Sequence, residues 1–419
     1  MSTDAMLSTA ASGTPETPKR RRLSTPRILL IIAGVLVGLS LVHLLTGADD
    51  VTSQGAIQAA LQAAIPLGLA GLGGLWSERA GVVNIGLEGQ MILGTWFGAW
   101  GSLQYGPWAG LALGILGGAI GGLIHALATV TFGVDHIISG VAMTILAPGI
   151  ARYLSFLAWN GTPGAGPTQS PTVKPLPRVS VPGVDSLASL ERHHWFLVSD
   201  VAGVLRGLLV DVSVVTILAV LLIPLTWLVL WRTSFGLRVR SVGEDPQAAE
   251  SLGINVYKYK YYGVIISGAM AGLGGVFLST VSSVIYREGQ TGGRGYIGLA
   301  AMIFGNWRPG GLALGASLFG YTDALQLRRG SESVHALLIL VGALLLALAV
   351  WETIRRNRVV AIASAVLGVL SYVIFFAVDK IPTALVQAAP YITVLVVLAL
   401  AAQRLRMPAA DGKPYRRGG

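Results

Sequence analysis

The fold depends on residues 293–307, which read GRGYIGLAAMIFGNW. This segment is apolar, but it is shorter than the ~20 residues that cross the hydrocarbon core of a bilayer. Glycines begin and interrupt it. Such a segment is typical of an interrupted membrane helix, whose exposed backbone groups are tolerated only where protein or a water-filled path surrounds them. We therefore expect a broken helix here, and the number of membrane crossings depends on it.

The composition is that of a protein embedded in lipid. Hydrophobic residues make up 53% of the 419 positions, charged residues 12%, and the mean hydropathy is +0.67. A soluble domain could not bury so much apolar surface. The chain has no cysteine, which excludes disulfides and thiolate metal sites. Its net charge of +10 falls in short clusters beside apolar spans, as expected for cytoplasmic loops and lipid headgroups, so we expect membrane lipid and no nucleic acid as a partner.

Apolar spans near the length of a membrane crossing can be drawn at 28–46, 55–76, 85–104, 108–131, 134–158, 209–231, 258–284, 310–326, 334–352, 359–378 and 385–403. A basic cluster at 19–22 places the N-terminus in the cytoplasm, and six crossings then place the loop 232–257 there too. Without a further crossing, the basic residues 355–358 and the tail 404–419 would lie outside. A crossing at 293–307 removes this conflict.

These features predict an all-α polytopic protein of the cell membrane, with about 12 transmembrane helices and both termini in the cytoplasm. We expect a disordered tail at 1–27, a membrane domain at 28–403, an external loop at 160–205, and a cytoplasmic tail at 404–419. The pair of spans in 334–378 looks like an insertion, and an even insertion preserves the orientation of the later part of the chain.

The broken-helix segment also belongs to an internal repeat. Residues Ile85-Gly86-Leu87, Met91-Ile92, Gly94, Trp96, Pro107 and Gly110-Leu111-Ala112-Leu113-Gly114 recur in order as Ile297-Gly298-Leu299, Met302-Ile303, Gly305, Trp307, Pro309 and Gly311-Leu312-Ala313-Leu314-Gly315. By the crossing count, the two copies run in opposite directions across the membrane. Two inverted repeats with interrupted helices place a substrate path at their interface, so both copies are candidates to line it.

A second distinctive segment is a short capped helix in the loop 232–257. Asp245 suits the N-cap, Pro246 the first helical position, Gln247 to Leu252 the helix, and Gly253 the left-handed residue that ends it. So short a helix is not stable alone in water. It either docks against another protein or is an ordinary interfacial loop helix.

The candidate path residues are Asn84, Glu88, Gln90, Trp96, Tyr296 and Met302. An ionisable residue within a span is costly unless it is paired or hydrated, so Glu88 is a candidate functional residue. A structural role is the favoured alternative: Glu88 could accept hydrogen bonds from the backbone of a broken helix or pair with Arg79. Trp96 could stack on a purine or sugar, although such residues more often anchor at the membrane interface. We expect His125 to be a hydrogen-bonding partner between helices.

Two motifs carry a resemblance to a known family. Residues 77–91, SERAGVVNIGLEGQM, resemble the ERxGVxNIGxEGxM motif of nucleoside-type permeases of ABC importers, which work with a basic-membrane-protein-like lipoprotein. Residues 247–253 resemble the Glu-Ala-Ala-x-x-x-Gly loop of ABC importer permeases, with Gln247 in place of the glutamate. The lead-in 233–243 and the ending 408–418 are also similar to the family.

The resemblance implies that the short helix is the coupling helix that inserts into an ATPase subunit. The implied coupling residues are Asp245, Pro246, Gln247, Ala248, Ala249 and Gly253. The implied partners are an ATP-binding subunit carrying ATP and Mg²⁺, a second related permease, and an extracytoplasmic substrate-binding lipoprotein, which the loop 160–205 could contact. We expect this chain itself to bind no cofactor and no metal and to catalyse no reaction.

The energy source is expected to lie in a partner. The chain has no Gly-x-x-x-x-Gly-Lys-Ser/Thr phosphate loop and no series of buried carboxylates of the kind a proton-coupled carrier shows. The favoured interpretation is a nucleoside importer permease that works by alternating access. Sugar or branched-chain amino acid import, a stand-alone secondary transporter and a structural scaffold are the alternatives.

Overall fold

The computed structural model describes residues 25–48, 51–193, 195–328, 330–378, 380–382, 384–389, 391–392 and 405–416. Most of the expected tail at 1–27 and most of the span at 385–403 lie outside these residues. The described part is mostly helical, and its two named strands form one small sheet in which β1 (Arg178–Val179) pairs antiparallel with β2 (Val212–Ser213).

The helices, in chain order, are α1 Thr25–Thr46, α2 Gln54–Arg79, α3 Leu87–Tyr105, α4 Pro107–Ala126, α5 His136–Trp159, α6 Leu187–Arg192, α7 Val198–Leu209, α8 Val214–Arg232, α9 Ser234–Glu244, α10 Pro246–Ser251, α11 Val256–Phe277, α12 Arg294–Phe304, α13 Pro309–Leu327, α14 Gly330–Ile354 and α15 Arg358–Ala377. Helices α4 and α11 each continue into a π-helical turn, at Leu127–Thr131 and Leu278–Ser282.

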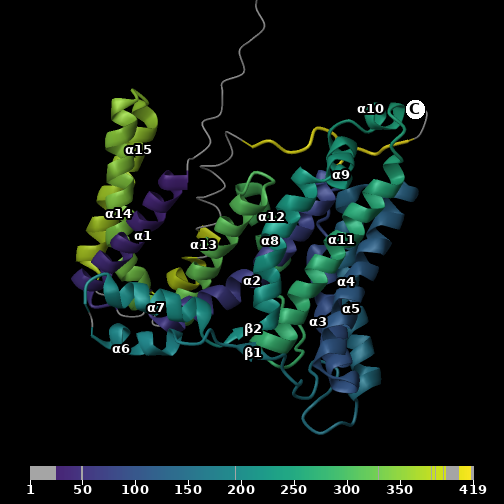
Figure 1. Ribbon diagram of the computed structural model, residues 1–419, viewed down its shortest axis with the longest axis horizontal. Helices are drawn as coiled ribbons and strands as arrows, with labels where there is room; N and C mark the ends of the chain where they lie inside the picture. The colour runs from purple at the N-terminus through teal and green to yellow at the C-terminus, as the bar shows by residue number, and fades with distance from the viewer. Residues whose placement is uncertain are drawn as a thin grey trace, which may run out of the picture.

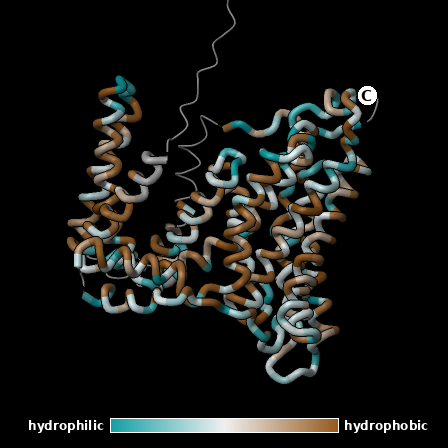
Figure 2. Tube along the Cα trace, in the orientation of Figure 1, coloured by the Kyte–Doolittle hydropathy of each residue, from teal (hydrophilic) through white to brown (hydrophobic). Residues whose placement is uncertain are grey.

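Seven helical segments of the described chain are long and apolar enough to cross a membrane: Gln54–Arg79, Pro107–Thr131, His136–Trp159, Val214–Arg232, Val256–Ser282, Ser331–Ile354 and Arg358–Ala377. Shorter apolar helices occupy Ala33–Thr46 and Arg294–Phe304. The protein is therefore an all-α polytopic membrane protein, as the composition predicts. Apolar residues run along the helices, and polar residues gather toward the two ends of the bundle (Figure 2).

Side-chain caps mark where several spans begin. The Asp135 carboxylate accepts hydrogen bonds from the backbone N–H groups of Ile137 and Ile138 at the start of α5. Asn255 accepts one from Lys258 at the start of α11. Each cap satisfies donors that the first helical turn leaves unpaired.

The body of the protein is a bundle in which α2, α3, α4 and α11 pack together, α5 lies on α3, and α12 and α13 lie against α2 (Figure 1). Helices α14 and α15 pair with each other beside α1, to one side of this body. Helix α10 lies at one end of the bundle, and α6, α7 and the small sheet lie at the other. We call these the α10 end and the α6 end.

Glycines allow α4 and α11 to approach closely. A Cβ atom added at Gly118 would lie 2.3 Å from the carbonyl oxygen of Gly268 and 2.5 Å from the Cα of Gly272. Added at Gly268, it would lie 2.3 Å from the carbonyl oxygen of Gly118. The two backbones are thus in direct contact, which is the packing expected of small-residue rows in membrane helices.

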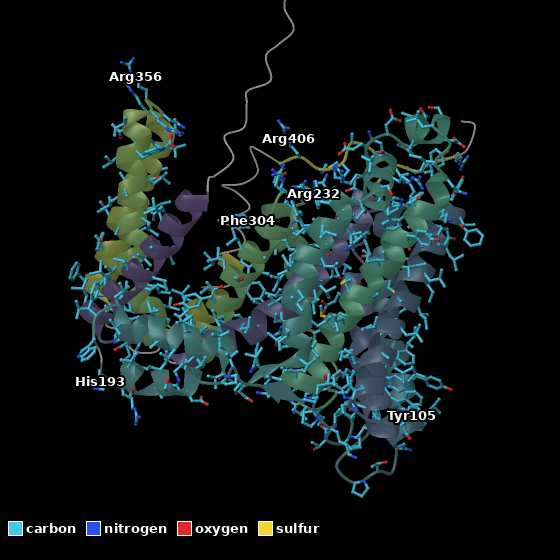
Figure 3. The ribbon with its side chains drawn as sticks, in the orientation of Figure 1. Tyr105, His193, Arg232, Phe304, Arg356 and Arg406 are labelled. Carbon is cyan, nitrogen blue, oxygen red and sulfur yellow. The ribbon has the colours of Figure 1, made fainter. Side chains whose placement is uncertain are left out.

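The labelled arginines show how the two ends of the molecule relate. Arg232, Arg356 and Arg406 lie at the α10 end, whereas Tyr105 and His193 lie at the α6 end (Figure 3). The basic loop 355–358 is therefore on the same side as α10. This is the relative placement that an additional crossing between residues 285 and 310 produces.

Candidate transport and docking sites

Helix α12 begins within the protein, and Glu88 of α3 caps it. The backbone N–H of Gly293 donates to Oε1 of Glu88 at 2.9 Å, and that of Gly295 donates to Oε2 at 2.7 Å. Glu88 is only 5% exposed. Both carboxylate oxygens are therefore held by the N-terminus of a helix of 11 residues, where the helix dipole favours negative charge.

This contact joins the two repeat copies, because Glu88 lies in the first and α12 in the second. Of the two structural roles expected for Glu88, the structure shows the first: Glu88 accepts hydrogen bonds from the backbone of a broken helix and does not pair with Arg79. Arg79 instead donates through Nη2 and Nε to the carbonyl oxygen of Trp307, at 2.7 and 3.2 Å. One end of α12 is thus held by Glu88, and the residues just beyond its other end are held by Arg79.

Asn84 and Gln90 form a buried amide pair next to Glu88. The Asn84 Nδ2 group donates to Gln90 Oε1 and to Ser267 Oγ, both at 2.9 Å, and Gln90 Nε2 donates back to Asn84 Oδ1 at 3.3 Å. Both side chains are fully buried. They pair with each other and with α11, and their contribution to a substrate path stays a prediction.

The remaining path candidates differ in their surroundings. Trp96 is buried, donates through Nε1 to Ser155 Oγ at 2.9 Å, and stacks on Trp100 with ring centroids 5.9 Å apart. Met302 is also buried, whereas Tyr296 of α12 is 43% exposed. In this conformation Tyr296 is the one of the six path candidates with an exposed side chain. Stacking of a substrate on Trp96 would require its aromatic cluster to open.

Both ring nitrogens of His125 lie within hydrogen-bond distance of groups in neighbouring segments. Its Nδ1 lies 2.9 Å from Ser139 Oγ, and its Nε2 lies 3.0 Å from the carbonyl oxygen of Val83. The ring joins α4 to α5 and to the segment before α3, which is the kind of interhelical partner expected of it.

The short helix α10 has the geometry that its sequence predicts. Asp245 caps it, with Oδ1 accepting from the backbone N–H of Ala248 at 2.9 Å, and Pro246 is its first residue. Gly253 ends the turn at φ +79°. Ala249 is buried at 2% exposure, but Leu252 is 80% exposed at the tip.

Comparison with known proteins places this architecture in a family. A family profile described as "Branched-chain amino acid transport system / permease component" matches residues 56–349. The chain belongs to this permease family. The match includes Glu88, α10 and α12, and it begins after α1.

Several relatives are similar over most of their length. The guanosine ABC transporter permease protein NupQ of Bacillus subtilis is 39% identical over 280 residues, covering 65% of this chain and 81% of the relative. The nucleoside ABC transporter permease protein NupC of Lactococcus lactis is 32% identical over 359 residues, covering 84% and 93%. The putative glucose ABC transporter permease protein TsgC13 of Haloferax volcanii is 37% identical over 281 residues, covering 67% and 79%. No solved structure gives a significant match.

Sequence reasoning missed how the permease's C-terminal tail is held. Residues 405–416 run across the α10 end toward α10 (Figure 1). The backbone N–H of Arg406 donates to Asn306 Oδ1 at 2.8 Å, and that of Ala410 donates to the carbonyl oxygen of Gly243 at 3.0 Å. The Tyr415 hydroxyl donates to the carboxylate of Glu250 in α10. Extended segments such as this carry no periodic signal, so only the folded chain shows these contacts.

Asp411 in this tail is buried close to Glu78, Lys260 and Arg79. Burial raises the pKa of Asp411 to about 7, although the hydrogen bond with Glu78 and the two basic groups act in the opposite direction. A raised pKa means that the docked tail binds the Asp411 proton more tightly than the released tail does. Docking is therefore most stable below the ordinary pKa of 3.8 and weakens as the pH rises through about 7.

We expect a spin label attached at Arg416→Cys to become more mobile as the pH rises from about 6 to about 8, with the released-to-docked ratio changing by at most about tenfold per pH unit. The measurement is the electron paramagnetic resonance line shape of the purified permease. Asp411→Asn is the matched control and should flatten the dependence. A label whose mobility is constant across this range in the otherwise native chain would contradict the prediction.

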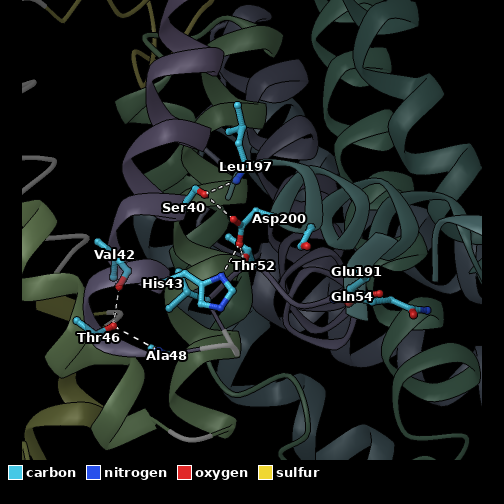
Figure 4. A network of polar contacts seen from close by, with 12 residues as sticks. Ser40, Val42, His43, Thr46, Ala48, Thr52, Gln54, Glu191, Leu197 and Asp200 are labelled. Carbon is cyan, nitrogen blue, oxygen red and sulfur yellow. Dashed lines mark hydrogen bonds and ion pairs between the residues drawn. The ribbon is translucent and has the colours of Figure 1, made fainter. Parts of the chain in front are cut away.

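A second network unforeseen from the sequence lies at the α6 end (Figure 4). Buried Asp200 of α7 accepts hydrogen bonds from Ser40 Oγ at 2.5 Å and from the Thr52 hydroxyl, and its Oδ1 lies 2.8 Å from Nδ1 of His43. Burial alone would raise the pKa of Asp200, but these contacts together lower it. The network fastens α1, which lies outside the family match, to α7 of the loop region.

Proposed function

We propose that this chain is the membrane-spanning permease subunit of an ATP-driven importer of nucleosides, coupled through α10 to an ATP-hydrolysing partner. The observation that carries the proposal is α10 itself: a capped helix of 6 residues, with an 80% exposed leucine beyond its end, at one end of a permease bundle. ATP and Mg²⁺ belong to the partner, and this chain supplies the path.

A movement of α10 would be transmitted to the bundle through two direct contacts, one between α9 and α2 and one between Arg79 and Trp307. Helix α9, which leads into α10, ends against α2: a Cβ atom added at Gly243 would lie 2.3 Å from the carbonyl oxygen of Arg79. Arg79 in turn holds the carbonyl oxygen of Trp307, just beyond α12. Closing of the ATPase would thus displace the ends of α2 and α12 together. A displacement of this kind moves one repeat against the other and opens a central path alternately to each side.

The orientation of the permease is part of the same proposal. ATP is a cytoplasmic substrate, so the α10 end faces the cytoplasm, and the arginines at that end agree with the excess of basic residues in cytoplasmic loops. The α6 end and the loop 160–205 then face outward, where a substrate-binding lipoprotein delivers its ligand. A second related permease would complete the path. Cross-linking of α10 to the ATPase would also support this orientation.

A neutral solute fits the chemistry of the broken helix. In transporters of this kind, the N-terminus of a half-helix commonly holds an anionic group of the substrate. Here Glu88 already occupies the N-terminus of α12 with both oxygens. This favours a nucleoside or a sugar over an amino acid, whose carboxylate would need such a site. The similarity to permeases named for guanosine and nucleosides favours nucleosides over the glucose named for TsgC13.

Two substitutions in α10 test the proposal. Ala249→Arg places a long charged side chain at a buried position, and Gly253→Pro removes an N–H that donates to the carbonyl oxygen of Glu250 at 2.8 Å. We expect both variants to insert normally but to transport at least tenfold less nucleoside per ATP hydrolysed. The substitutions disturb the conformation of α10 and leave the transmembrane bundle intact. The measurement is uptake and ATP hydrolysis by the reconstituted transporter.

The matched control for Gly253→Pro is Gly183→Pro. Gly183 has φ +86°, has no atom within 4 Å of an added Cβ, and lies before α6 at the opposite end. It should leave assembly with the ATPase intact. Native coupling in both α10 variants would refute the role of α10. Uptake by this chain alone in vesicles, without any ATPase, would favour the stand-alone transporter.

A further inference from the structure

The tail and α10 form a single groove at the α10 end. A pocket of about 490 Å³ lies between them, lined on one side by Glu244, Asp245 and Gln247 and on the other by Ala410, Lys413 and Tyr415. Neither segment could form this groove alone. The tail contacts Glu244 before α10 and Glu250 within it, so a protein that binds α10 on the side of the groove also meets the tail.

The two walls of the groove carry opposite charges. The α10 wall contributes the carboxylates of Glu244 and Asp245, both exposed, and the tail contributes the exposed basic residues Lys413 and Arg416. The helix alone would present an acidic surface with an apolar tip. With the tail in place, the surface presents both signs of charge around that tip, and such patterns fix the register of a docked partner.

The tail also holds α10 in position. The backbone N–H of Ala410 donates a hydrogen bond to the carbonyl oxygen of Gly243, just before α10. The backbone N–H of Ala409 donates to Glu244 Oε2 at 3.2 Å. Further along, Tyr415 bonds to Glu250 and packs on Tyr257, with ring centroids 5.5 Å apart. The tail therefore touches the residues before, within and after α10.

We propose that residues 405–416 are the second half of the docking surface for the ATP-hydrolysing subunit, which binds α10 and the tail together. This inference rests on the proposed coupling role of α10. The tail is a second segment that contacts the ATPase, and it also holds α10 in the orientation that the ATPase binds.

Cross-linking tests the inference in the assembled transporter. The chain has no native cysteine, so a cysteine-reactive photo-cross-linker attached to this chain marks one chosen site. The sites are Gln247→Cys in α10, Lys413→Cys in the tail, and Arg356→Cys as the control. Arg356 is exposed and lies at the same end of the molecule but far from α10, on the α14–α15 pair (Figure 3). We expect cross-links to the ATPase from positions 247 and 413 and none from 356.

Charge reversal provides a second readout. Lys413→Glu should weaken binding of the ATPase by about fivefold in a salt-dependent manner, because it reverses one of the two positive charges that the tail contributes to the groove. The matched control is Lys174→Glu, the same change at an exposed position in the external loop, which should have no effect. The measurement is the affinity of the purified ATPase for the reconstituted permease at low and high salt.

The outcomes separate the two proposals. Cross-linking from 247 without 413, or native ATPase affinity in Lys413→Glu, would overturn the role of the tail and leave the role of α10 intact. Absence of a cross-link from 247 would overturn the proposed function of α10 and with it the joint surface.

Discussion

Glu88→Leu is expected to abolish ATP-driven uptake. The substitution removes both hydrogen-bond acceptors of the Gly293 and Gly295 N–H groups and the negative charge at the N-terminus of α12. Hydrogen bonds to a charged group contribute about 1.5–3 kcal/mol each, and buried donors left without partners add a desolvation cost. Because Glu88 joins the two repeats, its loss frees one end of the half-helix that would move during transport.

Glu88→Gln is expected to be intermediate. Glutamine keeps the shape and one acceptor oxygen, but its NH₂ group would face one of the two backbone N–H donors, so one hydrogen bond is replaced by a repulsive contact. We expect uptake to fall by about tenfold or more, in keeping with the loss of one charged hydrogen bond. The measurement is initial uptake by the reconstituted transporter, together with the melting temperature of the permease, which reports the structural part of the effect.

A substitution on the other side of the contact provides the check. A Cβ atom added at Gly295 would lie 2.6 Å from the backbone nitrogen of Glu88 and 2.8 Å from its Oε2. Gly295→Ala should therefore displace α12 from Glu88 and reproduce much of the Glu88→Leu loss. Full uptake by Glu88→Leu would refute the coupling of the two repeats through this carboxylate.

Gly118→Leu is expected to prevent correct folding of the bundle. Even the first atom of the new side chain would meet the backbone of α11 at Gly268 and Gly272, within 2.5 Å. Overpacking commonly costs about 1–3 kcal/mol. Here the obstructing atoms are backbone and cannot turn aside, so α4 and α11 must separate. We expect a several-fold loss of monodisperse permease and a large fall in its melting temperature.

The control for this prediction is Gly149→Leu in α5. An added Cβ at Gly149 has no atom within 4 Å, and the residue is exposed. The same change of residue on another spanning helix should leave yield and melting temperature nearly unchanged. Equal loss in both variants would show that a leucine in place of glycine disrupts folding wherever it is placed on a spanning helix, and would refute a specific role for the contact between α4 and α11.

The sequence by itself predicted the features that depend on neighbours along the chain. The spans follow from runs of apolar residues, and α10 follows from Asp245, Pro246 and Gly253, whose capping and turn preferences act within a few residues. The short helix at α12 was also predictable, because glycines and limited length mark an interruption. The likeness of residues 77–91 and 247–253 to permease motifs pointed to the family that the comparisons show.

The tertiary structure decided which of these elements meet. The backbone partner of Glu88 at Gly293 is separated from it by 205 positions in the chain. The sequence left open whether Glu88 caps a backbone or forms an ion pair with Arg79. The contacts of the tail with Gly243 and Glu250 and those of Asp200 with Ser40 join residues that no local pattern relates. Local preferences act over a few residues, whereas a buried carboxylate takes whichever donors the packed helices bring within reach, and that packing exists only in the folded chain.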